Sequence, residues 1–209
     1  KKKNWLKIKT TYDNYVGFLK YRKLSYNKFK PSYKVYRLRT KIFIKLKNRF
    51  FSSKKFLYFG TKISVLNSNT KFFEFEKNKW IKKKDLKPIN YYEKNFSKIL
   101  KLFLNIKYLW GGKTSNGIDC SALVQIYFFF NNIYFPRDTK DQISFIRKVK
   151  NRKLYNKYNL LYWKGHVAIS LNKNLLIHAY GPKKKVVIMK KNKTIEEIKK
   201  NININLKKI

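Results

Sequence analysis

The sequence is poor in residues that make covalent cross-links, with one cysteine among 209 residues. A single cysteine excludes a disulfide framework within the chain and a cysteine-rich zinc site. It leaves the redox compartment open, because one thiol is compatible with either environment. Long apolar runs are also missing: no stretch reaches the roughly 18 consecutive apolar residues of a membrane-spanning helix, so we expect no membrane span.

Acidic residues are scarce as well. The chain has 10 Asp and Glu against 52 Lys and Arg, a formal net charge of +42. One interpretation is a binder of nucleic acid or another polyanion, because such charge attracts phosphates over long range. The other is compositional drift, since Lys, Asn, Ile, Phe and Tyr dominate together as in proteins of A+T-rich genomes. Lysines lie along the whole chain rather than on one segment, which favours drift, with non-specific polyanion binding and no specific nucleic-acid partner.

A hydrophobic content of 44% is enough to build a core, and the length suits one large domain or two to three small ones. The chain starts KKKNW without a methionine, and we expect it to be a fragment of a longer protein. We identify no signal peptide, and a fragment would say little about targeting. A cytoplasmic and a cell-envelope location of a bacterial protein both stay open, as does the oligomeric state.

The first ninety residues predict short strands. Residues 5–24 read as a strand, a tight polar turn around Tyr12-Asp13-Asn14 and a second strand. From residue 33 onward, short alternating runs recur with turn residues between them, which is typical of a small barrel or sandwich. Residues 88–90 read as a linker. After it, apolar residues at helical spacing predict a helix beginning near Asn90 or Asn95.

The most informative stretch runs from residue 108 to residue 142, YLWGGKTSNGIDCSALVQIYFFFNNIYFPRDTKDQ. Glycines make the approach to Cys120 a loop, and the apolar run after it predicts a buried helix. Cys120 is therefore expected in the first helical turn, a position that lowers a thiol pKa through the backbone N–H groups and the helix dipole. An inert, buried cysteine is the alternative.

The only two histidines, His166 and His178, lie in apolar segments that predict consecutive antiparallel strands, joined by a turn at residues 172–174. Both imidazoles can then face the same side. A cysteine at a helix start followed by two histidines on a hairpin is the order expected of a thiol nucleophile, a base and an orienting group. Zinc fits less well, because it takes three or four ligands. We expect neither a metal nor a cofactor.

Five blocks occur in order: YLWGG, GIDCSALVQ, PRDTKDQ, GHVAI and IHAY. Together they are similar to the successive motifs of the NlpC family of cell-wall cysteine peptidases, over about residues 93–187. The resemblance implies a papain-like fold, in which a helix carries the cysteine and an antiparallel sheet carries both histidines. It also implies cleavage of the γ-D-glutamyl to diamino-acid bond of murein stem peptides.

The resemblance assigns roles position by position. Cys120 is the nucleophile, His166 the base and His178 the orienting residue, while the Tyr108 hydroxyl helps the Cys120 N–H stabilise the oxyanion. Three further residues match substrate-binding or pocket positions: Asp119, Ser121 and Trp110. A helix cap is an equally good interpretation of Asp119. Core packing is an equally good interpretation of Trp110. Arg137 and Asp138 match a family motif that we interpret as a loop held by an Arg–Asp contact and a helix cap.

Residues 60–89 resemble a bacterial Src-homology-3-type (SH3-like) barrel, and residues 5–19 resemble the closing half of another, with an irregular extension as the alternative for residues 1–30. The predicted fold class is α+β. The predicted domains are a partial barrel (1–30), a barrel (31–90) and a papain-like peptidase domain (91–209). In the family, such barrels often accompany a requirement for a free amino-terminal L-alanine on the substrate.

The sequence thus predicts a cysteine peptidase that hydrolyses murein peptides through an acyl-enzyme. A catalytically silent protein that binds cell-wall polymer or polyanions is the alternative from another class. An amidase or acyl transferase that uses the same triad is the alternative closer to the peptidase in chemistry.

Overall fold

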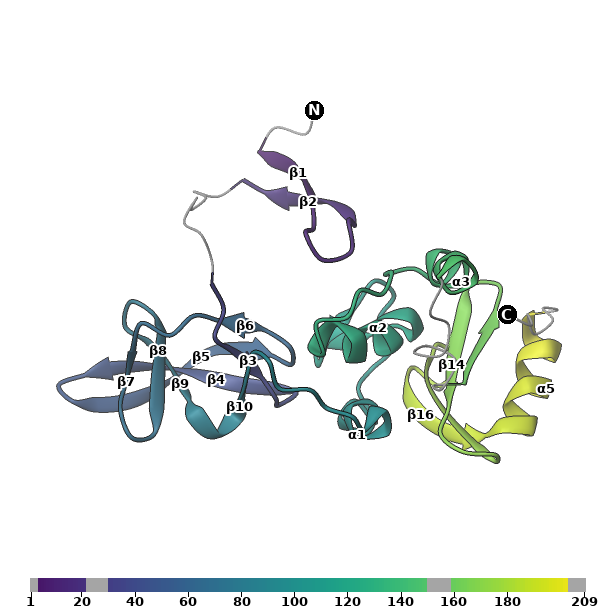
Figure 1. Cartoon of the computed structure of the whole chain (residues 1–209). Helices are drawn as coiled ribbons and strands as arrows, with labels where there is room; N and C mark the ends of the chain where they lie inside the picture. Colours follow the sequence, from purple (N-terminus) through teal and green to yellow (C-terminus); the bar gives the residue numbers. More distant parts are fainter. Residues whose placement is uncertain (1–3, 22–29, 150–158, 203–209) are drawn as a thin grey trace.

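The structure is a computed structural model that describes residues 4–21, 30–149 and 159–202, with side chains to residue 200. The molecule is elongated, with small β-sheets at one end and a layered helix–sheet part at the other (Figure 1). The α+β class predicted from the sequence is confirmed. The three predicted domains stay a prediction, and the predicted boundary at residue 30 directly follows residues 22–29, which lie outside the described residues.

The amino-terminal segment is a two-stranded antiparallel hairpin of β1 (Trp5–Lys9) and β2 (Val16–Lys20), as the strand–turn–strand pattern predicts. Its strands are largely exposed, but the tip of its turn contacts the rest of the molecule. The Tyr12 hydroxyl donates to the Ile133 carbonyl at 2.6 Å, and Asp13 Oδ2 accepts from Gln125 Nε2 at 2.8 Å. The hairpin is therefore anchored by its turn and not by its strands.

Residues 30–90 form two small sheets. The first has the order β10–β3–β6 and the second β5–β4–β9–β8–β7. Their strands and one short 3-10 helix are β3 (Tyr33–Val35), β4 (Arg39–Leu46), β5 (Arg49–Tyr58), β6 (Lys62–Ile63), β7 (Asn67–Ser68), β8 (Phe72–Glu76), β9 (Lys79–Lys82), η1 (Lys83–Asp85) and β10 (Leu86–Pro88). The short strands are confirmed. The described strands form no closed barrel, so the SH3-like architecture stays a prediction.

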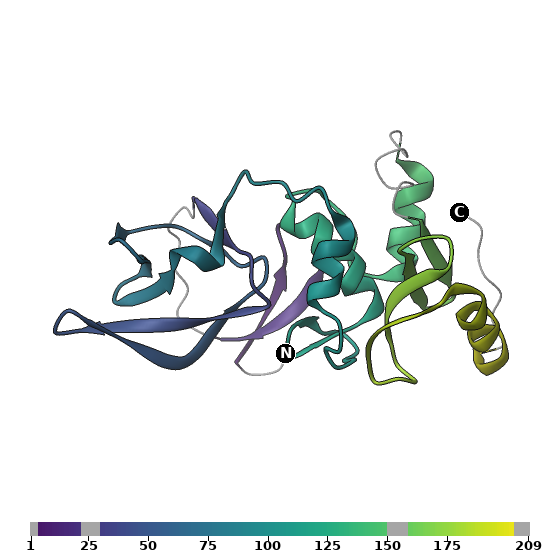
Figure 2. The same ribbon diagram turned by 90° about the horizontal axis from the view of Figure 1, so that it is seen from below.

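The rest of the chain packs helices on both sides of a meander, the sheet β13–β14–β15–β16. Its elements are α1 (Phe96–Leu102), β11 (Lys113–Thr114), β12 (Gly117–Ile118), α2 (Cys120–Phe130), α3 (Thr139–Lys148), β13 (Leu160–Trp163), β14 (His166–Ser170), β15 (Leu175–Tyr180), β16 (Lys185–Lys190) and α5 (Lys191–Ile202). Helix α1 begins after Asn95, whose side chain accepts from the Lys98 N–H, as predicted. Both views show α2 on one side of the meander and α5 on the other (Figures 1 and 2).

Strand alternation explains why the meander carries two cores. Val167, Ile169 and Ile177 join α2 in the main hydrophobic cluster. Leu176 and Tyr180 belong to a second cluster with Ile198 of α5. Successive residues of a strand point to opposite faces, so each strand contributes to both clusters. Helix α2 is buried on almost every side, which is why its sequence is apolar without an amphipathic period.

Helix α2 also contacts the amino-terminal sheets through its last residues. Phe59 stacks on Phe130 with ring centroids 4.8 Å apart. The fully buried Lys34 donates from Nζ to the Phe130 carbonyl at 2.6 Å, which satisfies a free carbonyl at the end of the helix. Burial lowers the pKa of Lys34 to about 8. The sheets and α2 therefore meet around Phe130, and we call the contact of Lys34 and Phe59 with Phe130 the α2–sheet interface.

Candidate active site

Cys120 is the first residue of α2, and Asp119 is its N-cap. The Asp119 carboxylate accepts from the Ala122 N–H at 2.8 Å, so the predicted helix start and cap are both confirmed. Backbone N–H groups of Val167, Ser121 and Cys120 itself point at the sulfur and lower its pKa, but burial is the larger effect and raises the pKa of the thiol to about 11. The expected lowering of the pKa is therefore outweighed in this structure.

The two histidines contact each other across the hairpin of β14 and β15. The turn of this hairpin is closed by Asn172 Oδ1, which accepts hydrogen bonds from the N–H groups of Asn174 at 2.9 Å and Leu175 at 2.8 Å. His166 Nε2 and His178 Nδ1 lie 2.9 Å apart, so the predicted same-side placement is confirmed. Burial lowers the pKa of His166 to about 4. Burial, with the nearby charge of His166, lowers that of His178 to about 3.

The start of β14 lies next to the thiol. The Val167 N–H points at the Cys120 sulfur, and Gly165 lines the same cavity as Cys120, so the residues on both sides of His166 adjoin the nucleophile position. Within the described part of the chain, no hydrogen bond joins the thiol to an imidazole. The structure thus brings the imidazole pair together and brings its strand to Cys120, while the Cys–His–His triad stays a prediction.

A cavity of about 300 Å³ opens over Cys120. The residues predicted to act on or bind substrate outside the imidazole pair line it: Tyr108, Trp110, Asp119, Cys120 and Ser121. Trp110 is 85% exposed, which excludes core packing as its role. These side chains come from the loop before α2 and from its first turn, as the sequence motif requires.

Tyr108 is fixed at the cavity edge by its backbone. Its N–H donates to the Lys184 carbonyl at 2.8 Å, and it forms a β-bridge with Ile118. Burial raises the pKa of the Tyr108 hydroxyl, and negative charge on Cys120 and Asp119 adds to this. The hydroxyl therefore stays protonated at neutral pH and can donate a hydrogen bond into the cavity.

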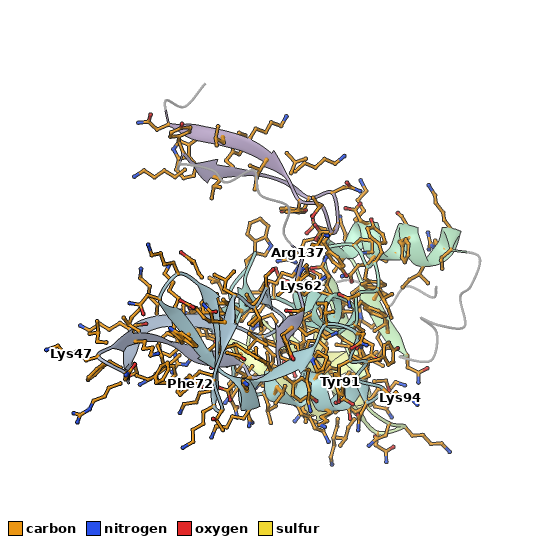
Figure 3. All side chains as sticks on the ribbon, turned by 60° about the vertical axis from the view of Figure 1, so that its left-hand side comes forward. Lys47, Lys62, Phe72, Tyr91, Lys94 and Arg137 are labelled. Carbon is orange, nitrogen blue, oxygen red and sulfur yellow. The ribbon has the colours of Figure 1, made fainter. Side chains whose placement is uncertain are left out.

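Arg137 anchors the loop before α2. Its guanidinium donates to Asp119 Oδ1 at 2.9 Å and to Oδ2 at 2.6 Å, in a bidentate ion pair that is almost fully buried. It also donates to Ser121 Oγ at 2.9 Å. Figure 3 shows Arg137 in the crowded interior beneath the amino-terminal hairpin, whereas Lys47 and Lys94 point outward. The Arg–Asp contact exists, but its partner is Asp119.

The predicted cap by Asp138 is only positional. Asp138 is the residue before α3, but its side chain makes no capping hydrogen bond. The Asp119 carboxylate makes more contacts, because it also accepts a hydrogen bond from the Gly111 N–H at 2.8 Å. Asp119 therefore holds together the loop, the helix start and Arg137, and its charge is compensated before any substrate binds.

The sequence did not predict Tyr15, which comes from the amino-terminal hairpin and lines the cavity. The anchored turn of the hairpin brings it there. The half-buried Lys113 packs against that turn, with Nζ 5.5 Å from the centre of the Tyr12 ring. Burial lowers the pKa of Lys113 to about 8. No local pattern around Tyr15 predicts that it lines the cavity, because this placement depends on how distant segments of the chain pack.

The described residues contain no cluster of three or more His, Cys, Asp or Glu that could hold a metal ion. They also contain no helix long and apolar enough to cross a membrane.

A thiol at a helix start, beside a sheet that carries an imidazole pair, is the arrangement of papain-like cysteine hydrolases. Residues 105–202 match the model of the NlpC/P60 family. Over the whole molecule, the fold is similar to the crystal structure of an NlpC/P60 family protein from Bacillus cereus. The TM-score is 0.68 at 23% identity, covering 92% of this chain and 72% of that one.

Two curated relatives match shorter regions. The dipeptidyl-peptidase 6 of Lysinibacillus sphaericus is 35% identical over 77 residues, which are 37% of this chain and 28% of the relative. A probable endopeptidase NlpC homolog of Haemophilus influenzae is 31% identical over 90 residues, which are 42% of this chain and 49% of the relative. The matches therefore span less than half the length of either relative.

Proposed function

We propose that the protein is a cysteine peptidase that hydrolyses murein stem peptides, with Cys120 as nucleophile, His166 as base and His178 as the orienting residue. The observation that carries the proposal is the chain's single cysteine at a helix start, in a cavity, beside the strand that bears the paired imidazoles. The names of the two curated relatives, a dipeptidyl-peptidase and a probable endopeptidase, support the reaction class.

The proposed reaction has two stages. The Cys120 sulfur attacks the substrate carbonyl carbon while His166 takes the thiol proton, and His166 then gives that proton to the leaving amine. A thioester remains, and water hydrolyses it with His166 again acting as base. The Tyr108 hydroxyl and the Cys120 N–H are the proposed oxyanion donors, each worth about 2.7–4 kcal/mol of transition-state stabilisation by analogy with measured cases.

The pKa shifts favour a neutral resting pair. Burial raises the pKa of Cys120 to about 11 and lowers that of His166 to about 4, so thiol and imidazole are both uncharged at pH 7. Attack then needs proton transfer within the reaction step, and no preformed thiolate–imidazolium pair is required.

The proposed scissile bond is the γ-D-glutamyl to diamino-acid bond, as the family resemblance implies. Asp119 and Ser121 are the proposed contacts for the amino end of the substrate, and Trp110 and Tyr15 the walls of its cleft. Because Arg137 compensates the Asp119 charge, we expect Asp119 to receive an ammonium group through hydrogen bonding more than through net charge. The proposed organisation keeps residues 1–30, 31–90 and 91–209 as its three parts.

The experiment is hydrolysis of L-Ala-γ-D-Glu-diaminopimelate, followed by mass spectrometry of the products. We expect the unmodified protein to release the diamino acid and Cys120→Ala to lose at least about a thousandfold in kcat, since the nucleophile is gone. Ser170→Ala, at the far end of β14, is the matched control and should keep full activity. A folded protein with no turnover would overturn the proposal, while an amide-exchange product would identify an acyl transferase.

A second candidate is polyanion binding, which a separate cavity favours. This cavity, of about 480 Å³, is lined by Thr70, Lys71, Phe72, Lys82, Lys83 and Lys84. Such a lysine-rich site would bind anionic polymers with an affinity that falls as salt rises. Binding that survives Cys120→Ala and disappears with added salt would support this function, and murein turnover would show that binding is not the sole activity.

A further inference from the structure

The far side of the imidazole pair contacts a sulfur atom. His178 Nε2 lies 3.3 Å from the thioether sulfur of Met189, the single methionine of the chain. Met189 is on β16, two positions beyond Val187, the residue paired with His178 across the sheet. Residues two apart on a strand share a face, so the sheet register itself places the sulfur beside the ring.

The direction of this hydrogen bond is fixed by chemistry. A thioether has no proton and can only accept, whereas each ring nitrogen of a neutral histidine is either a donor or an acceptor. The contact therefore favours the His178 tautomer that carries its proton on Nε2. In that tautomer Nδ1 has a free lone pair.

The tautomer of His178 determines the tautomer of His166. His178 Nδ1 then accepts from His166 Nε2 across the 2.9 Å contact, so the His166 proton is on Nε2. His166 Nδ1 is left with a lone pair that can take a proton. With the opposite His178 tautomer, His166 would carry its proton on Nδ1 and could not act as a base from that nitrogen.

We propose that Met189 is a positioning residue, whose thioether sets the tautomers of His178 and His166 and so keeps His166 ready to accept a proton. The catalytic consequence rests on the proposed peptidase function, but the tautomer assignment does not. Met189 does not line the cavity over Cys120, so it acts through the histidines and not on substrate.

The other groups around His178 cannot replace the sulfur as an acceptor for Nε2. The Tyr180 ring stacks on His178, with centroids 4.5 Å apart and planes 15° from parallel, so it covers the ring face. The Tyr180 hydroxyl donates to Glu197 of α5 at 3.2 Å. Trp163 of β13 contacts His166, with ring centroids 5.7 Å apart.

The direct test is ¹⁵N NMR of the unmodified protein with labelled histidine. With two histidines in the chain, the spectrum holds four ring-nitrogen signals, and their coupling to ring protons assigns them. At pH 7.5 we expect both rings to be neutral and both to carry the proton on Nε2. A His178 ring protonated on Nδ1 would overturn the proposal, whether or not the protein has peptidase activity.

Variants test the consequence. Met189→Leu removes the acceptor with little change in volume, and we expect His178 to show a mixture of tautomers and kcat to fall roughly three- to tenfold at unchanged KM, the effect of losing one hydrogen bond. Met189→Gln restores an acceptor and should recover the Nε2–H signal. Ile188→Leu, which faces α2 from the same strand, is the packing control. An unchanged tautomer in Met189→Leu would overturn the proposal, and an inactive unmodified protein with the expected spectrum would refute only the peptidase function.

Discussion

At Cys120 the helix start and the burial of the side chain act in opposite directions. The helix start offers the N–H groups of Cys120 and Ser121 to the sulfur, and Val167 of β14 adds a third, yet burial prevails and the pKa rises to about 11. A thiol in this state reacts slowly with soluble reagents. The reactivity expected of a nucleophile must come from a base at the moment of attack.

Alkylation with iodoacetamide measures this effect, because the chain has a single cysteine. With a pKa of about 11, thiolate forms as pH rises toward that value, so the rate should keep rising above pH 9 without a plateau. At pH 7 we expect a rate at least about a hundredfold below that of an ordinary thiol with a pKa of about 8.5. Mass spectrometry of the labelled protein gives the rate, and a plateau below pH 8 would contradict the prediction.

Among the elements, the loop before α2 depends on one ion pair. Arg137→Met leaves the Asp119 carboxylate buried without its cation, and we expect a loss of about 3–5 kcal/mol in the free energy of unfolding. Arg37→Met is the matched control, since the Arg37–Asp85 pair is 3.4 Å long with the arginine side chain 60% exposed. That pair should contribute less than about 1 kcal/mol. Urea denaturation compares the two variants, and equal losses would contradict the interpretation.

The histidine hairpin predicts a loss of stability in mild acid. The pKa values of about 4 for His166 and about 3 for His178 lie below the unfolded value near 6.5, so the unfolded chain takes up protons first. The contribution of the two histidines to the free energy of unfolding is complete above pH 6.5. It is lost as pH falls below this value, by about 1.4 kcal/mol per pH unit for each histidine.

Denaturation between pH 6.5 and pH 5, above the titration of most carboxylates, checks this prediction. His178→Gln removes one titrating group, so its stability should depend on pH about half as steeply. A pH-independent stability of the unmodified protein in this range would show that the imidazoles are not buried as described.

How much of the site the sequence could predict depends on the range of the interaction. Cys120 at a helix start and the two histidines on one hairpin follow from local patterns, and these predictions are confirmed. The Asp119 partner of Arg137 and the Tyr15 wall depend on segments far apart in the chain. The pKa of Cys120 depends on total burial, which no local pattern provides.

Across the whole molecule, the α2–sheet interface contains a buried lysine. The pKa of Lys34 is lowered to about 8, so between about pH 8 and pH 9.5 the folded protein loses this proton before the unfolded chain does. Stability should therefore rise with pH over this window. The increase of stability with pH that comes from Lys34 should disappear in the Lys34→Met variant. It should remain in Lys94→Met, because Lys94 is exposed. Thermal denaturation at pH 8 and pH 9.5 gives the comparison, and equal pH responses of the two variants would contradict it.

The α2–sheet interface also limits how the protein can be divided. The linker at residues 88–90 looks like a place to separate a catalytic fragment, but Phe59 and Lys34 lie on its other side and cover Phe130. A fragment starting after the linker would expose this aromatic end of α2 and the carbonyl that Lys34 caps. Such a surface favours aggregation. Expression of the protein for crystallography or screening should therefore keep the sheets and α2 in one polypeptide.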